Sequence, residues 1–122
     1  MASPTVRVDR ARSAERIEND IETLCGPDYT LSQEAIRRYA YTPVYRNTLD
    51  YFTRALETLG FEVYEDPLGT LVARNRRRGE PVFGIGSHCD SNRNGGRFDG
   101  TLGVVTALEV CRLNKELGLG LP

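Results

Sequence analysis

The chain has little of what marks a nucleic-acid-binding, membrane or secreted protein. Its 16 Lys and Arg nearly balance its 17 Asp and Glu, so the formal net charge of −1 creates no overall field for nucleic acid or anionic lipid. No apolar run approaches the roughly 20 residues that a membrane span needs. The N-terminal residues lack the apolar core of a secretory signal. These absences predict one soluble globular domain at most, in the cytoplasm, with no nucleic-acid or membrane partner.

Cysteine and histidine are also scarce. The cysteines are Cys25, Cys89 and Cys111, an odd number at scattered spacing with no Cys-x-x-Cys pair. This pattern indicates free thiols in a reducing compartment. His88 is the only histidine. Cys89 is therefore interpreted as a small buried hydrophobe and not as a nucleophile, because no second His exists to activate it.

Two further patterns are interpreted as structural. Residues 74–78 read Arg-Asn-Arg-Arg-Arg, with no interleaved aromatic residue and with Glu62, Glu65 and Glu80 close by in sequence. A solvated turn between strands is favoured there over a phosphate-binding patch. The glycines at 95, 96 and 100 do not form the Gly-x-Gly-x-x-Gly pattern of a dinucleotide cradle.

Apolar periodicity and turn residues predict an α/β protein. A first helix carries Ile17, Ile21 and Leu24 and stops at Gly26-Pro27. A capping box at 30–33 predicts a short helix to about residue 39, and Thr42-Pro43 begins a longer amphipathic helix that Gly60 closes. Alternation predicts strands at 61–65, 70–74 and 81–87.

The last predicted helix, residues 101–117, is apolar nearly all round. Only a narrow stripe of this helix is polar and predicted to face solvent, so we expect the helix to be buried on most sides. The stripe consists of Glu109, Arg112, Lys115 and Glu116. Such a helix needs more partners than three short strands and one amphipathic helix supply. The tail at 118–122 resembles the lead-in to another strand. The sequence therefore looks like the front of a larger domain.

The candidate chemistry lies at the corner between the strand at 81–87 and the last helix. His88 and Asp90 would share one face of the strand, so the carboxylate could accept one ring N–H and leave the other nitrogen for a metal. Asp99 follows eleven residues after His88, across Gly95 and Gly96, which let the backbone fold back. Such donors suit zinc, manganese or cobalt. The alternatives are a simple His–Asp hydrogen bond and an Asp99 that only caps the helix.

The corner motif resembles a known family. Gly86-Ser87-His88-Cys89-Asp90, followed by Gly-Gly-Arg-Phe-Asp-Gly-Thr-Leu-Gly-Val at 95–104, is similar to the first metal-binding segment of the N-carbamoyl-L-amino-acid hydrolase and allantoate amidohydrolase family. That family belongs to the aminoacylase-like dinuclear zinc metallopeptidase superfamily. The resemblance spans roughly residues 40–117. The sequence departs from the family pattern at 91–93, where Ser-Asn-Arg replaces a Thr-x-Pro-like stretch, and at Thr70, where Asn is common.

The resemblance implies two divalent metal ions, zinc or else manganese, cobalt or nickel. His88 would be a terminal ligand of one metal, Asp99 would bridge both, and Asp90 would orient His88. The peptide bond after Asp99 would be cis. The implied fold is the N-terminal portion of a zinc-peptidase-like catalytic domain, with helices packed on a mixed sheet. Residues 1–122 would be an incomplete part of that domain, without the general base, the remaining ligands and the lid domain that usually dimerises.

The implied activity is hydrolysis of a linear amide or ureido C–N bond in a small molecule, an N-carbamoyl amino acid or a ureide, within a longer, homodimeric enzyme. A dipeptidase or aminoacylase of the same superfamily is an alternative, although the Gly-Gly-Arg-Phe-Asp-Gly loop favours the carbamoylase side. A second alternative is a truncated, non-catalytic fragment that acts through protein contacts. With one His, the chain alone is expected to be inactive.

Overall fold

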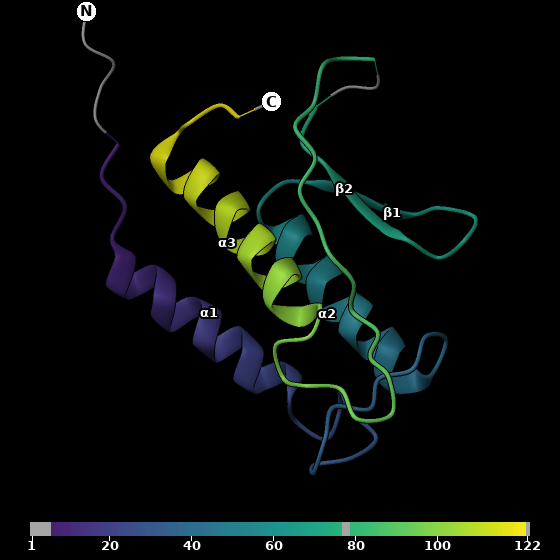
Figure 1. The fold of residues 1–122 in the computed structure, drawn as a ribbon. Coiled ribbons are helices and arrows are strands. Elements are labelled where there is room, and N and C mark those ends of the chain that lie inside the picture. The colour runs from purple at the N-terminus through teal and green to yellow at the C-terminus, as the bar shows by residue number, and fades with distance from the viewer. Residues whose placement is uncertain (1–5, 77–78, 122) are drawn as a thin grey trace, which may run out of the picture.

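The computed structural model describes residues 6–76 and 79–121, which form three helices and one hairpin. The elements are α1 (Arg10–Leu24), α2 (Pro43–Thr58), β1 (Glu62–Glu65), β2 (Leu71–Arg74) and α3 (Thr101–Leu117). Helix α3 lies between α1 and α2 and packs against both, while the β1–β2 hairpin packs on α2 (Figure 1). The long connection from β2 to α3 carries the candidate site.

The first and third predicted helices form where the sequence places them. Asp9 caps α1 by accepting from Arg12 N at 3.1 Å, and the helix ends before Gly26. Thr42 caps α2 by accepting from Tyr45 N at 3.4 Å, with Pro43 at the first helical position. These two predictions and the helix over 101–117 are confirmed.

The first two predicted strands form an antiparallel hairpin. Glu62 pairs with Arg74 and Glu65 with Leu71 across the ladder. Asp66 stabilises the turn, because its Oδ1 accepts from Leu68 N at 2.9 Å and from Thr70 N at 2.8 Å. These hydrogen bonds, the one to Thr70 foremost, hold the pKa of the Asp66 carboxyl below its usual value.

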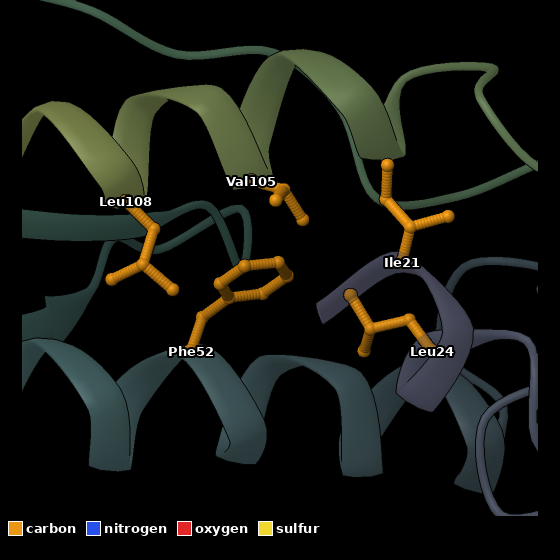
Figure 2. Close-up of a cluster of buried hydrophobic side chains, with 5 residues drawn as sticks. All are labelled: Ile21, Leu24, Phe52, Val105 and Leu108. Atoms are coloured by element: carbon orange, nitrogen blue, oxygen red, sulfur yellow. The ribbon is translucent and has the colours of Figure 1, made fainter. Parts of the chain in front are cut away.

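The core lies among the three helices. Ile21 and Leu24 from α1, Phe52 from α2, and Val105 and Leu108 from α3 form one buried cluster. Figure 2 shows the Phe52 ring projecting from α2 toward the apolar side chains of α3, with Ile21 and Leu24 closing the other side. Each of these side chains contributes about 1.5–3 kcal/mol by leaving water. This cluster fixes the start of α3, where the candidate site ends.

The short helix expected after the capping box does not form. The Thr30 hydroxyl accepts from Arg37 N at 2.9 Å, and Leu31 N donates to Arg37 O at 2.9 Å. These bonds close residues 30–37 into a loop, because the side chain that would cap a helix binds the far end of the segment instead. Ile36 then forms an isolated antiparallel bridge with Gly95.

The strand expected at 81–87 and the mixed sheet are also absent. Within the described residues the sheet has two strands, both antiparallel, and no ladder includes 81–87. A strand requires a neighbour that shares its backbone hydrogen bonds, and none of the described strands pairs with this segment. Its residues run as irregular chain (Figure 1), with Val82, Phe83 and Ile85 exposed.

Half of the polar stripe of α3, Glu109 and Arg112, faces α1, whereas Lys115 and Glu116 are exposed as predicted. Glu109 is only 3% exposed and pairs with Arg16 of α1 at 2.5 Å, and Arg112 pairs with Asp20 of α1 at 2.6 Å. The prediction of a solvated stripe at Glu109 and Arg112 is therefore wrong. Leu102 and Leu117 are instead exposed, so burial of the apolar faces is incomplete.

The structure bears out only part of the prediction for the three cysteines. Cys25, Cys89 and Cys111 are free thiols, but Cys89 is partly and not fully buried; this burial raises the pKa of Cys89 to about 11. Arg77 and Arg78 of the basic run, and Pro122 of the tail, lie outside the described residues.

No helix in the described part of the chain combines the length and apolarity needed to cross a bilayer.

Candidate metal centre

The structure brings together the three residues that the sequence singles out. His88 Nε2 lies 3.5 Å from Asp99 Oδ1, and His88 Nδ1 lies 3.4 Å from Asp90 Oδ1. The three side chains are about half exposed, at 52%, 52% and 46% for His88, Asp90 and Asp99. The two carboxylates therefore lie on opposite sides of one imidazole that is open to solvent.

The neighbours of Nδ1 determine the ring's tautomer. Nδ1 lies 3.0 Å from the backbone carbonyl oxygen of Asp90. A carbonyl oxygen carries no proton, so Nδ1 must be the donor, and the lone pair of the neutral ring is then on Nε2. Orientation of His88 by Asp90 was expected from its carboxylate, but the closer contact comes from its main chain. The nitrogen that faces Asp99 is the one able to bind a metal.

A tight turn at Gly100 places Asp99. Thr101 N donates to Asp99 O at 2.7 Å, and Gly100 has φ 67° and ψ −46°, the geometry of a γ-turn. The Asp99–Gly100 peptide bond is trans, so the expected cis bond is wrong. The positive φ of Gly100 lets the chain turn sharply at this point. Asp99 does not cap α3, because Gly100 is the capping residue and no side chain caps the helix.

The spacing of His88 and Asp99 fits a shared metal ion. Two donors each about 2.1 Å from one tetrahedral zinc are about 3.4 Å apart. The observed separation of Nε2 and Oδ1 is 3.5 Å. The described residues contain no group of three or more His, Cys, Asp or Glu side chains placed to hold a metal ion. His88 and Asp99 are therefore two candidate donors and not a complete ligand set.

The site opens onto a large apolar cavity. A hollow of about 700 Å³ is bordered by α2, the hairpin, the segment at 82–90 and α3, and both His88 and Asp90 line it. Tyr41 and Tyr45 line the same hollow. Burial, followed by the nearby Cys89 and Asp90, raises the pKa of the Tyr45 hydroxyl. The Tyr45 phenol therefore keeps its proton at neutral pH.

Sequence reasoning missed one residue that contacts both halves of the site. Arg38 is 1% exposed, and its guanidinium donates to Cys89 O and to Thr101 Oγ1. The residue lies inside the segment predicted as a short helix, where an Arg is expected to face water. Two adjacent arginines carry no periodic signal that distinguishes the buried one, so the sequence pattern could not have identified it.

Comparisons with known proteins find relatives of this chain. No protein-family model matches the chain. The sequence is 38% identical over 107 residues to the N-carbamoyl-L-amino-acid amidohydrolase of Paenarthrobacter aurescens, covering 86% of this chain and 26% of that protein. It is 33% identical over 70 residues to a ureidoglycolate hydrolase of Oryza sativa, covering 56% of this chain and 14% of the relative.

A solved structure shares the fold. The hydantoinase/carbamoylase family amidase of Burkholderia phymatum superposes with a TM-score of 0.76 at 29% identity, over 93% of this chain and 26% of the amidase. The chain is thus related to amidohydrolases that act on C–N bonds. Within that class it belongs to the hydantoinase/carbamoylase family and matches the N-terminal region of its members. The chain spans about a quarter of the length of these relatives.

Proposed function

We propose that this chain supplies one His and one carboxylate ligand to the dinuclear metal centre of a longer amidohydrolase. The observation that carries the proposal is the 3.5 Å separation of His88 Nε2 and Asp99 Oδ1, with Nδ1 already engaged by Asp90. The bound metals, zinc or else manganese, cobalt or nickel, would polarise the substrate carbonyl and activate a water. Such a centre hydrolyses amide-like C–N bonds.

Each of the three residues has a separate task in this proposal. His88 presents Nε2 to one metal, because its proton is held on Nδ1 by the Asp90 carbonyl. Asp99 offers two carboxylate oxygens from a turn that Gly100 fixes, and it would bridge the two ions. Asp90 keeps the ring in one orientation. Residues 1–122 would be the N-terminal part of the catalytic domain, and the general base and the other ligands would come from elsewhere in the enzyme.

The proposed substrate is a small molecule with a linear ureido or amide group, such as an N-carbamoyl amino acid or a ureide. Relatives named for both kinds of substrate support this class. The half-exposed site beside a 700 Å³ hollow is accessible to a molecule of that size. A chain that offers two metal donors is not expected to turn over substrate by itself.

Metal titration of the chain tests the ligand assignment. We expect the unaltered chain to bind Zn²⁺ weakly in isothermal titration calorimetry and to give Co²⁺ visible absorption, and His88→Ala and Asp99→Asn to lose both. Glu18→Gln is the matched control, because it removes one negative charge from an exposed position on α1. Zn²⁺ binding that is equal in the unaltered chain and in His88→Ala would refute the assignment.

A transplant tests the reaction class. Residues 6–121 would replace the matching segment of the Paenarthrobacter aurescens enzyme, and ammonia release from an N-carbamoyl-L-amino acid would be measured. We expect metal-dependent activity in the chimera and none after His88→Ala. A folded, metal-loaded chimera that keeps its activity after His88→Ala would contradict the proposed role.

A further inference from the structure

Among the described residues, Arg38 is a fully buried cation with no carboxylate partner. The residue is 1% exposed, and among the ion pairs of the described residues none involves it. Its guanidinium instead donates to neutral oxygens, and burial lowers its pKa below the usual value for arginine. Burying a charge without a counter-charge is costly, so hydrogen bonds must compensate for the lost water.

The acceptors of Arg38 lie in three separate parts of the fold. Nε donates to Tyr29 O at 2.7 Å, and Nη2 donates to Leu24 O at the end of α1. Nη1 donates both to Cys89 O at 3.1 Å and to Thr101 Oγ1 at 3.2 Å. One planar group thus joins the end of α1 to two other segments of the chain.

Those two segments are the ones that carry the candidate ligands. Cys89 directly follows His88, and Thr101 lies two residues after Asp99 at the first position of α3. A single nitrogen of Arg38 therefore bridges the backbone beside His88 and the side chain at the start of α3.

The main chain around Arg38 holds the intervening loop. Arg38 N donates to Ser91 Oγ at 2.9 Å, and Ser91 N donates to Arg38 O at 2.9 Å. Ser91 Oγ donates to Ile36 O at 2.7 Å, and Ile36 N donates to Gly95 O at 2.9 Å. Replacing only the Arg38 side chain would leave these contacts in place, which isolates the guanidinium for a test.

We propose that Arg38 is a positioning residue whose guanidinium sets the distance between His88 and Asp99, an inference that rests on the proposed metal-binding function. It touches neither metal nor substrate. Its effect on the site passes through the Cys89 carbonyl and the Thr101 hydroxyl.

Three variants separate positioning from general stability. Arg38→Met removes every N–H donor at similar length, and Arg38→Lys keeps the charge but not the planar two-nitrogen fork. Arg112→Met is the matched control, because Arg112 is also largely buried and joins α3 to Asp20 of α1. Within the described part of the chain, the side chain of Arg112 pairs with Asp20 and Glu109 and with neither ligand-bearing segment.

The first readout needs no metal. His88 is the only histidine, so its imidazole Cε1–H gives one NMR signal, and long-range ¹⁵N correlation reports the tautomer. We expect that signal to shift and the Nδ1–H tautomer to be mixed in Arg38→Met and Arg38→Lys. Arg112→Met should leave both unchanged.

The second readout is Zn²⁺ affinity by titration calorimetry on folded protein. We expect Arg38→Met to weaken Zn²⁺ binding by about tenfold, the loss typical when a residue that orients a ligand is removed. Should Arg38→Met fail to fold, Thr101→Val removes only the side-chain acceptor at α3, and Thr101→Ser keeps it. The Val variant should show the same changes in weaker form, and the Ser variant neither.

The proposal is overturned if folded Arg38→Met, or Thr101→Val in its place, leaves the His88 signal and the Zn²⁺ affinity unchanged. It is also overturned if Arg112→Met alters both to the same extent. Failure of the unaltered chain to bind Zn²⁺ would instead count against the proposed function. The His88 signal would then still decide whether Arg38 positions the imidazole.

Discussion

The imidazole of His88 packs directly against the backbone of Gly100. A Cβ built at position 100 would lie 2.5 Å from His88 Nδ1 and 2.3 Å from His88 O. Gly100 also has φ +67°, where an L-side chain is strained. Two independent constraints therefore require glycine at the residue that follows a candidate ligand.

Gly100→Ala should both destabilise the chain and displace His88. We expect the free energy of unfolding in urea to fall by about 2–4 kcal/mol, because backbone strain and overpacking add. The His88 NMR signal should shift as the ring is pushed away, and Zn²⁺ binding should weaken.

Gly118→Ala is the control for this experiment. Gly118 has φ +58° at the end of α3, but no heavy atom lies within 4 Å of its built Cβ. The substitution should cost only the strain of the left-handed conformation, about 1 kcal/mol, and leave His88 unchanged. Equal effects of the two substitutions on the His88 signal would contradict the close packing at position 100.

Asp90→Asn tests which part of Asp90 orients the imidazole. The backbone carbonyl is 3.0 Å from His88 Nδ1, whereas the carboxylate is 3.4 Å away. We expect the Nδ1–H tautomer to persist in Asp90→Asn and Zn²⁺ affinity to fall much less than in Asp99→Asn. NMR and calorimetry measure the two effects. Loss of the Nδ1–H tautomer in Asp90→Asn would show that the carboxylate orients the ring.

Local signals in the sequence predict most helices and the hairpin. Thr42 and Pro43 define the start of α2, and Asp66 defines the turn, because each acts through its own neighbours. Thr30 presents an equally good local signal that fails, since its hydroxyl binds Arg37 N across a loop. A capping pattern does not reveal whether a more distant donor competes for the same oxygen.

Features that depend on distant partners could not be predicted in the same way. The alternation at 81–87 indicates a strand, but no ladder pairs this segment among the described residues. Glu109 looks like a surface residue until α1 places Arg16 beside it. The approach of His88 to Asp99 was inferred from glycines and a family resemblance. No pattern in the sequence indicates that the Arg38 guanidinium bridges the segments that carry these two residues.

The α1–α3 interface should depend strongly on the partner of Glu109. Arg16→Met would leave Glu109, whose side chain is 4% exposed, without its 2.5 Å partner. We expect a loss of about 2–3 kcal/mol in urea unfolding, because the buried carboxylate would keep only its longer, 3.6 Å ion pair with Arg112. Arg46→Met breaks exposed pairs with Asp50 and Glu65 and should cost below about 1 kcal/mol.

A double variant distinguishes charge burial from packing in that interface. Arg16→Met combined with Glu109→Leu removes both charges, so it should be more stable than Arg16→Met alone. Glu116 also contacts Arg16, but its side chain is more exposed than that of Glu109. Loss of this contact should therefore lower the free energy of unfolding less. A double variant as unstable as the single one would show that Arg16 acts through packing of its stem and not through its charge.

Burial of Cys89 predicts a specific loss of stability in alkali. Its pKa rises from an ordinary value near 9 to about 11 in the folded chain, mainly through burial. Between these values the unfolded chain loses the thiol proton first, so the free energy of unfolding falls as pH rises from 9 to 11. Below pH 9 both states keep the proton, and the thiol adds no slope.

Cys89→Ala isolates this contribution from those of the other titratable groups, which both proteins share. We expect the difference in urea-unfolding free energy between the unaltered chain and Cys89→Ala to be constant from pH 7 to about 8.5. It should then shift in favour of the variant by about 1.4 kcal/mol for each unit of pH between the two pKa values. A difference that stays flat up to pH 11 would mean that the thiol beside His88 is not held in its neutral form.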